Sequence, residues 1–477
     1  MANPNISDDN LKYTTDFQLE SVGIISGAGV FDLTSFLVEL SYFENIFSPF
    51  ISGKLVISDS AGLVNMMSLN GNEYIKIAFR KNNRQMHNPN TETINRTFRV
   101  VSISERTINT GNNYETYFIE FCSDEMVLSE QYRLSKSYRK KSISDIIIDI
   151  MNNYLGVGVN NNNTKSFFYE KTDGVFDIVL PNKKIFDTIT WLCSYAKSTN
   201  NKLGADMLFF ETNLGFQFNS LQTLFSRQPV QTFTYNPKNL PDPSGNPLLD
   251  EEQTEIMKLE MVNNFNTLKG ASKGAFSNRL IAINPLTRTK NSVDFSYNDY
   301  YAKSSNGRLN SSPVINNLKN RFGKALYDAP PNNMESGPLR VCMTNSGQDT
   351  IDYIKSKPGS VTNNFFIENN IPNRIAQLEL AQYNKLKVVI PGYNEIYAGM
   401  VVNIEVVMTT AVSEDMGERN LDPYLSGSYL VSALRHLITN NSYITVMELI
   451  KDSSSEIHVP VDATNSLISK IVKGDQS

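Results

Sequence analysis

From residue 30 to about residue 124, apolar residues alternate with polar ones, and this period restricts the fold more than any other feature. Three stretches carry the pattern: Phe36, Val38, Leu40 and Tyr42; Ile75, Ile77 and Phe79; Tyr117, Ile119 and Phe121. Successive side chains of a β-strand point to opposite faces, so the period indicates half-buried antiparallel strands. Turns rich in Asn and Gly separate the strands. We predict an all-β barrel or sandwich over residues 1–125.

The period becomes helical after residue 125. Within residues 142–156, apolar side chains recur at i, i+3, i+4, i+7, i+8 and i+11, Ser142 can cap the start, and Gly156 can end the helix. A second apolar stripe begins near Asn182, and a hairpin pattern follows at residues 207–218. We predict a middle α+β domain over residues 126–237.

The remaining chain mixes ordered and irregular segments. Residues 236–251 contain four prolines with Ser, Gly and Asp, which is typical of a linker. Strand patterns return at residues 255–287 and 371–452, with a short helix at residues 371–383, and we predict one discontinuous β-domain from both segments. Residues 288–370 are rich in Asn, Ser, Lys and Pro and are predicted to be an inserted region with a short strand at Leu339–Met343. Residues 453–477 are a C-terminal extension.

Two β segments far apart in the chain share one layout. Residues 71–77 precede a strand at 98–104, an Asn-rich turn and a partner strand at Tyr117. Residues 398–404 likewise precede a strand at 429–435, an Asn-Asn turn and a partner at Tyr443. Identity is low and strand sequences often look alike, so coincidence is the alternative. We predict that the chain contains two copies of one barrel.

Charge and cysteine content exclude several classes of function. The chain of 477 residues has 44 Lys and Arg against 49 Asp and Glu, and 56 Asn. Because nucleic-acid binding needs clustered basic residues, we predict no specific nucleic-acid binding. Cys122, Cys193 and Cys342 lack CxxC spacing, so small buried apolar roles are favoured over disulfides or metal ligands. No apolar run approaches the ~20 residues of a membrane helix, and the polar, acidic N-terminus is unlike a secretory signal.

Short motifs give no catalytic, cofactor-binding or metal site. Residues 26–32 resemble the start of a dinucleotide fingerprint, but Asp32 takes the third glycine position, so a turn is favoured. Residues 270–274 lack the P-loop spacing and are interpreted as a flexible loop. The basic run at residues 139–141 is interpreted as a solvated turn.

Histidine and tryptophan are too sparse to suggest a site. His436 is interpreted as a packed or interface histidine on a strand, and His87 and His458 as exposed. No His spacing matches a zinc site and no carboxylate spacing identifies a glycosidase pair. A packing role is favoured for Trp191 over ligand stacking. We predict a protein that is not an enzyme and uses no cofactor.

Several motifs, in their order along the chain, resemble the central baseplate hub protein of contractile-tailed bacteriophages, a domain family shared with type VI secretion spike proteins. Residues 373–383, the Pro391-Gly392 turn, residues 398–404 and residues 427–436 look like the closing barrel of that family. Residues 53–60 with 70–77 are similar to its first barrel, and residues 185–218 to its middle domain. The resemblance covers residues 1–287 and 371–451.

The resemblance implies a mainly β fold with α+β parts: two tail-tube-like antiparallel β-barrels, a middle α+β domain and an inserted region. It also implies a homotrimeric ring of pseudo-sixfold symmetry in the virion tail baseplate, assembled in the host cytoplasm. The implied partners are the central spike protein and the tail tube or tube-initiator protein, together with baseplate wedge and tape-measure proteins, and DNA would pass through the ring. Two alternatives are a receptor- or glycan-binding β-rich tail protein and a hydrolase.

Overall fold

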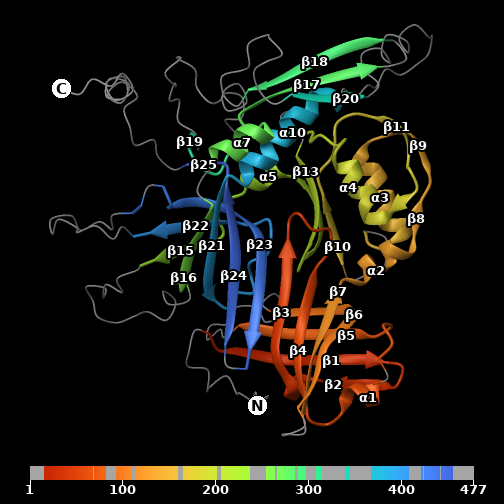
Figure 1. The fold of residues 1–477 in the computed structure, drawn as a ribbon, viewed down its shortest axis with the longest axis vertical. Helices are drawn as coiled ribbons and strands as arrows, with labels where there is room; N and C mark the ends of the chain where they lie inside the picture. The colour runs from red at the N-terminus through yellow and green to blue at the C-terminus, as the bar shows by residue number, and fades with distance from the viewer. Residues whose placement is uncertain are drawn as a thin grey trace, which may run out of the picture.

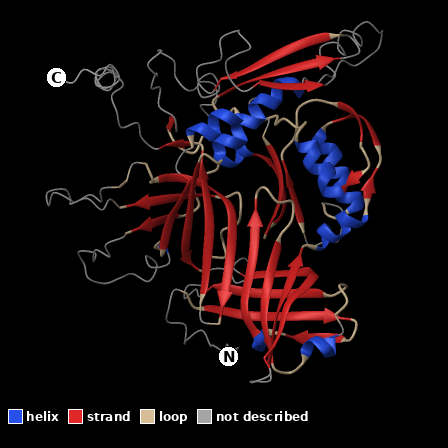
Figure 2. Cartoon of the chain, viewed as in Figure 1, coloured by secondary structure: helices blue, strands red, loops and turns tan. Residues whose placement is uncertain are grey.

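The structure is a computed structural model, shown in Figure 1. It describes residues 15–67, 69–81, 93–109, 114–158, 165–200, 206–236, 254–263, 266–284, 288–296, 308–313, 339–343, 367–407, 421–422, 424–440 and 442–454. Strands dominate, and the helices gather on one side and at one end (Figure 2). The prediction of a mainly β chain with α+β parts is confirmed.

One sheet of 13 strands forms the body of the molecule. Its order is β16-β21-β24-β23-β3-β4-β7-β6-β5-β1-β2, and β22 pairs with both β23 and β15. A 3-10 helix at Thr34–Phe36 and helix α1 (Leu63–Met67) connect strands of its N-terminal part. The strands are β1 (Phe17–Ser26), β2 (Gly29–Asp32), β3 (Leu37–Asn45), β4 (Ser52–Asp59), β5 (Tyr74–Lys81), β6 (Thr93–Asn109), β7 (Tyr114–Cys122), β15 (Thr232–Tyr235), β16 (Lys258–Asn263), β21 (Asn384–Pro391), β22 (Val401–Val406), β23 (Gly427–Thr439) and β24 (Tyr443–Lys451).

Two five-strand units within this sheet have the same topology. The first strand unit is β3-β4-β7-β6-β5 and the second strand unit is β16-β21-β24-β23-β22, in matching spatial and chain order. Every neighbouring pair in both units is antiparallel. The sequence repeat therefore corresponds to a structural one.

The residue register agrees with the repeat in detail. Tyr74 lies opposite Arg99 in the first unit, and Val401 lies opposite Leu430 in the second. A bulge then falls between Val100 and Ser102 of β6 and between Val431 and Ala433 of β23. These matches use the same alignment as the sequence repeat, with residue 74 equivalent to residue 401 and residue 100 to residue 431. A bulge at an equivalent position supports a true repeat, because related strands retain their bulges.

Strand β23 joins the two units. Residues 427–430 of β23 pair with β22 of its own unit. Its following half pairs with β3 of the first unit, from Ala433 opposite Asn45 to Thr439 opposite Glu39. We call this pairing the internal junction.

Each unit curls around its own apolar core. The first core includes Leu40, Leu55 and Phe98, and the second includes Val388, Val431 and Met447. The curl brings the residues before β3 next to β1, where the Leu33 N–H donates to Val22 O (2.8 Å). In the second unit it brings the residues before β16 next to β15, where the Ile256 N–H donates to Thr234 O (2.9 Å). Among the described residues no continuous strand ladder closes either unit, so closure into two barrels stays a prediction.

The middle part of the chain packs helices against small sheets. Ser142 caps α3 as expected, because its hydroxyl accepts from the Asp145 N–H (3.1 Å). Ile146, Ile150 and Ile189 of the two predicted apolar stripes are buried in one core. The elements are α2 (Asp124–Gln131), β8 (Arg133–Leu134), β9 (Ser137–Lys141), α3 (Ile143–Tyr154), β10 (Ser166–Tyr169), β11 (Phe176–Val179), β12 (Lys183–Lys184), α4 (Ile185–Cys193), β13 (Met207–Thr212), β14 (Gly215–Ser220) and α5 (Leu221–Phe225).

A third group of elements lies mainly between β16 and β21 in the chain, and only β25 follows β24. Strands β17, β18 and β20 of this group are at the top of Figure 1. Sheet β18-β17-β20 includes the strand expected at Leu339–Met343, and β19 pairs with β25. In the first unit the equivalent connection, between β3 and β4, is a short turn. The elements are α7 (Thr267–Lys273), β17 (Ser277–Asn284), β18 (Thr289–Ser296), β19 (Ser312–Pro313), β20 (Leu339–Met343), α10 (Ile367–Ala381) and β25 (Ser453–Ser454).

Two local predictions were wrong in this region. Residues 270–274 are not a flexible loop but the end of α7, where Gly274 adopts a left-handed conformation (φ 81°) and caps the helix. The short helix expected at residues 371–383 would have Pro372 in its first turn, but α10 begins at Ile367, so Pro372 lies inside the helix. Proline is favoured in the first turn of a helix, but here it does not mark where the helix begins.

Candidate functional site

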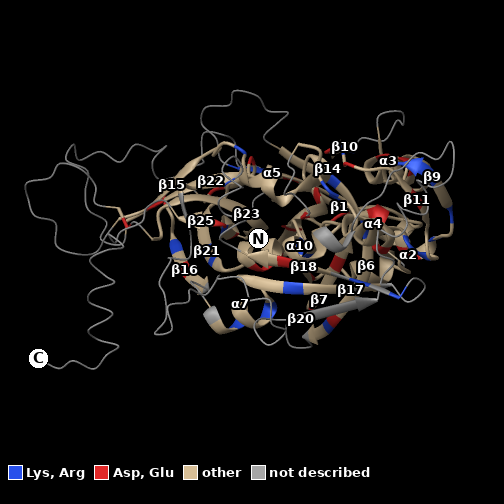
Figure 3. Cartoon of the chain, turned by 90° about the horizontal axis from the view of Figure 1, so that it is seen from above, with Lys and Arg blue, Asp and Glu red and all other residues tan. Residues whose placement is uncertain are grey.

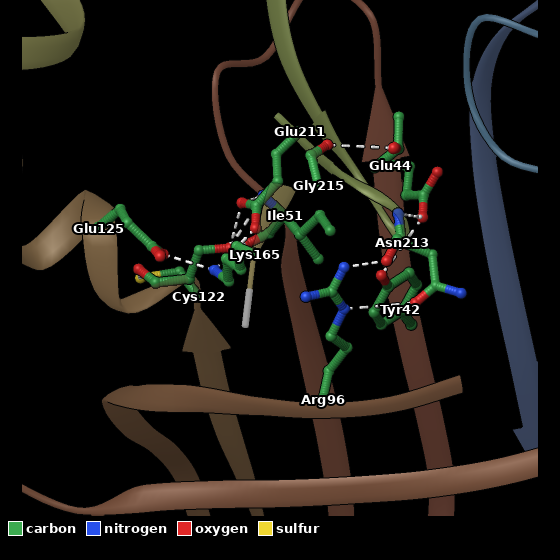
Figure 4. Close-up of polar contacts among 12 residues, drawn as sticks. Tyr42, Glu44, Ile51, Arg96, Cys122, Glu125, Lys165, Glu211, Asn213 and Gly215 are labelled. Carbon is green, nitrogen blue, oxygen red and sulfur yellow. Dashed lines mark hydrogen bonds and ion pairs between the residues drawn. The ribbon is translucent and has the colours of Figure 1, made fainter. Parts of the chain in front are cut away.

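The residues with the most unusual surroundings lie where the two strand units meet the middle part of the chain. Glu44, at the end of β3, is buried and accepts three hydrogen bonds (Figure 4). The donors are the Asn213 N–H (2.7 Å), the Ala398 N–H (2.9 Å) and the Tyr42 hydroxyl (3.3 Å). Asn213 belongs to the β13–β14 turn and Ala398 to the segment before β22. One carboxylate therefore links three parts of the chain.

Burial sets the protonation of Glu44. Removing the carboxylate from water raises its pKa to about 7, although the N–H donors at Ala398 and Asn213 and the Tyr42 hydroxyl favour the charged form. Arg96 of β6 contacts the same β13–β14 turn, because its guanidinium donates to the Asn213 carbonyl oxygen.

A second buried cluster lies beside the first. Glu211 of β13 accepts from the Ile51 N–H (3.1 Å), the Ser123 hydroxyl and Lys165 Nζ (2.8 Å). Lys165 Nζ also contacts Glu125 of α2 at 2.5 Å. Burial opposes the charge of Lys165, but the two carboxylates outweigh it and raise the lysine pKa. The cluster fastens the start of β4 and α2 to the β13–β14 hairpin.

This polar junction, defined as Tyr42, Glu44, Arg96, Glu125, Lys165, Glu211 and Asn213, has the chemistry of a structural joint. Its donors and acceptors are occupied by one another, and backbone N–H groups provide many of the contacts. A satisfied buried network of this kind fixes the relative placement of the segments that contribute to it. Sequence reasoning missed it. Glu44 continues the alternation of Leu40 and Tyr42, which are apolar residues of one strand face. A charged residue at a position of this apolar face was the available signal.

His436 lies in a second unusual environment, at the internal junction. It is fully buried, and its Nδ1 is 2.8 Å from the Tyr443 hydroxyl. The rings of Tyr42, Phe79 and Tyr443 surround it at centroid distances of 5.6 to 5.9 Å. Burial lowers its pKa to about 3, so the ring is neutral at physiological pH. The interpretation as a packed or interface histidine is confirmed.

The other motif residues lie apart from the polar junction. Residues 26–32 include the tight turn at residues 27–28, as expected, and strand β2 that follows it. The run 139–141 is exposed, as expected, but it lies in β9 and not in a turn. Trp191 packs edge to face against Tyr195 (4.9 Å between centroids) and borders a surface depression with Arg133 and Lys184. His87 and His458 lie outside the described residues.

Thiols and possible ligand groups add no site in the described part of the chain. Cys122 and Cys193 are free and buried, and burial raises their pKa values to about 11 and about 12, so both thiols are protonated. Cys342 lies in β20. The described residues contain no group of three or more His, Cys, Asp or Glu that could hold a metal ion. No helix among them is long and apolar enough to cross a membrane.

Comparison with known proteins identifies relatives of matching length. The chain is 22% identical over 425 residues to the probable baseplate hub protein gp334 of Vibrio phage KVP40, covering 89% of this chain and 91% of that protein. No known protein-family model matches.

Among solved structures, the chain is similar to a 43 kDa tail protein of prophage MuSo2 from Shewanella oneidensis, with 8% identity and a TM-score of 0.49, covering 91% and 98% of the two chains. A tail protein from Neisseria meningitidis MC58 matches with 10% identity and a TM-score of 0.47, covering 91% and 96%. The resemblance to baseplate hub proteins seen in the sequence motifs is therefore shown by a relative along nearly the whole chain.

Proposed function

We propose that this protein is the structural hub of a contractile phage tail baseplate. In this role three copies form a ring, which joins the hexameric tail tube to the trimeric central spike and lets DNA pass. The partners are the spike protein and the tail tube or tube-initiator protein, with wedge and tape-measure proteins at the periphery. The relative in phage KVP40, itself described as a probable baseplate hub protein, supports the baseplate assignment.

The repeated strand unit is the observation that carries the ring proposal. Each chain contains two units of identical strand order and a shared bulge. Three chains with two units each present six similar units, so one face can match a sixfold tube while the chains themselves obey threefold symmetry. We propose that each unit, curled around its own core, acts as one tube-like barrel.

The remaining segments receive roles within this scheme. The middle domain over residues 126–237 is held to both units by the polar junction, which keeps it at a fixed angle to the ring. We assign residues 288–370 to an insertion in the second unit. A net charge of −5 suits a channel for DNA, since an uncharged or acidic lining releases few counterions on contact with phosphates.

The proposal predicts the mass of the purified protein and its location in the virion. Light scattering should give three times the chain mass of 53.7 kDa, alone or with the spike protein. Mass spectrometry of purified tails should find the chain at half the copy number of one ring of the hexameric tail tube. Absence from purified tails, or a stable monomer even with the spike protein present, would contradict the hub assignment.

A further inference from the structure

Two strand edges, one on β6 and one on β16, have no partner strand among the described residues. The equivalent edges, on β23 and β3, pair with each other at the internal junction. In the second unit, the outer half of β23 pairs with β3. The equivalent outer half of β6, residues 101–109, pairs with β7 on one side and with no strand on the other among the described residues. The strand equivalent to β3 is β16, which pairs only with β21 in the described part of the chain. In the described part of the chain, each copy therefore has two open strand edges, one along the outer half of β6 and one along β16.

Exposed apolar side chains gather at these two edges. Met261 and Val262 of β16 are 51% and 53% exposed, and Val101 and Ile108 of β6 are 55% and 61% exposed. At the internal junction the counterparts of Met261 and Val101 are Tyr42 and Ser432, and both are fully buried. Large apolar side chains left open on a strand edge are typical of a surface that a partner covers.

We propose that β16 of one copy pairs with the outer half of β6 of a second copy, which repeats the internal junction between chains. This inference deepens the proposed ring and rests on it. Figure 1 and Figure 3 show β16 and β6 well apart, on either side of β23, as a head-to-tail contact requires. A contact of this kind closes into a ring when its rotation matches the symmetry, and three chains would alternate three internal junctions with three such contacts.

The repeat also sets the register of the proposed pairing. Strand β6 has a second bulge, between Ser104 and Thr107, which β23 lacks. Beyond it Ile438 and Ile108 are equivalent, since they lie opposite Tyr443 and Glu115 in matching ladders. Leu40 pairs with Ile438 at the internal junction, and Leu259 is the counterpart of Leu40. Ile108 of one copy should therefore lie opposite Leu259 of the next.

The neighbouring position follows the same rule. Thr107 should lie opposite Glu260, as Leu437 lies opposite Ser41. The charged residues Lys258 and Glu260 are exposed on β16, and they keep this edge soluble in the free chain.

Disulfide trapping tests the inference. The full chain with Ile108→Cys and Leu259→Cys should give covalent dimers and trimers on a non-reducing gel after mild oxidation. Thr107→Cys with Glu260→Cys should do the same. The matched control is Ile108→Cys with Val179→Cys, because Val179 is exposed but lies on β11, away from both edges. The control should give background cross-linking only.

A second variant tests the energy of the contact. Met261→Asp should weaken trimer formation about tenfold or more, since a carboxylate would be buried in the contact. Val179→Asp should leave trimer formation unchanged. Circular dichroism of both variants should match the unaltered protein, because both positions are exposed in one chain.

The outcomes separate this inference from the hub proposal. A trimer by light scattering that neither cysteine pair traps above the control overturns the edge pairing and leaves the hub standing. A protein that is trimeric only together with the spike protein, and that neither cysteine pair traps in assembled tails, likewise overturns the edge pairing alone. Absence of the protein from tails overturns the hub and, with it, the inference.

Discussion

The first and second strand units share strand order, bulge and backbone pattern, but they differ in what covers their edge strands. Strand β3 is covered by β23 of the same chain, and its Tyr42 side chain is fully buried. Strand β16 has the same place in the second unit, and its Met261 is half exposed. The strand framework is therefore repeated, while the residues on each edge are adapted to the neighbour that the edge meets.

The connections between edge strands differ as well. Between β3 and β4 the chain makes a short turn, whereas between β16 and β21 it adds α7, a separate sheet and α10. The insertion leaves the register of β16 against β21 like that of β3 against β4. A strand unit of this kind tolerates a long insertion because loop closure entropy grows slowly with loop length.

The largest expected effect compares the two equivalent edge residues. Tyr42→Ala should lower the free energy of unfolding by about 4 kcal/mol, because it leaves a cavity among Phe98, His436 and β23 and removes a donor to Glu44. Met261→Ala should change the stability of the single chain by less than about 0.5 kcal/mol. Denaturant unfolding below the concentration for association measures both. Equal effects would contradict the difference between the two edges.

Removing the carboxylate at the polar junction should have the next largest effect. Glu44→Ala leaves the buried N–H groups of Asn213 and Ala398 without their acceptor, and we expect a loss of about 3 kcal/mol. Glu20→Ala is the matched control, because its carboxylate is partly exposed in a surface pair with Arg80, and the expected loss is about 0.5 kcal/mol. A loss at Glu44 as small as that of the control would show that the junction is not a structural joint.

The two junctions should respond to pH in opposite directions. The Glu44 pKa is raised to about 7, so its contribution to stability is present below pH 4.5 and is lost as the pH rises to 7. The His436 pKa is lowered to about 3, so its contribution is present above pH 6.5 and is lost as the pH falls toward 3.

Denaturant midpoints between pH 4 and pH 7 measure these opposing effects. In Glu44→Gln the fall in stability with rising pH should become smaller, by about 2 kcal/mol over this range. In His436→Gln the loss on acidification should become smaller by a similar amount. A pH profile identical to that of the unaltered protein in both variants would contradict the burial of the two groups.

The smallest effects are expected from exchanging the residues at the equivalent bulges. Ser432→Val should lower the free energy of unfolding by about 2 kcal/mol, because the buried hydroxyl has the carbonyl and a carboxylate oxygen of Glu448 within hydrogen-bond distance (3.0 and 2.9 Å) and can donate to one of them. Val101→Ser, the converse exchange on β6, should stay within about 0.5 kcal/mol for the single chain. Thermal unfolding of both variants gives the comparison, and a larger loss at Val101 would indicate that the free edge of β6 is covered within the chain.

Much of the fold followed from local patterns. The alternating period of residues 30–124 and the cap at Ser142 gave correct elements, because both depend on residues near one another in the chain. The repeat of residues 71–77 and 98–104 in residues 398–404 and 429–435 also held, with equivalent strand pairing and a bulge at the equivalent position. Glycine and proline predicted the ends of helices less well. Residues 270–273, predicted to be a loop, belong to α7, and α10 begins before Pro372.

The candidate site could not be predicted in the same way. Glu44 meets Asn213 and Ala398 across 169 and 354 residues of chain, and nothing in the local sequence of β3 indicates either partner. Lys165, Glu125 and Glu211 are likewise ordinary charged residues until the chain brings them together.

By itself, the sequence determined where strands and helices form and that one strand unit occurs twice, because period, caps and turns act over a few residues. Only the tertiary structure decided that β23 covers β3, that β16 and the outer half of β6 each have one side without a partner strand among the described residues, and that Glu44 is buried. These outcomes depend on strand pairing and desolvation between distant segments, and local propensity does not encode such contacts.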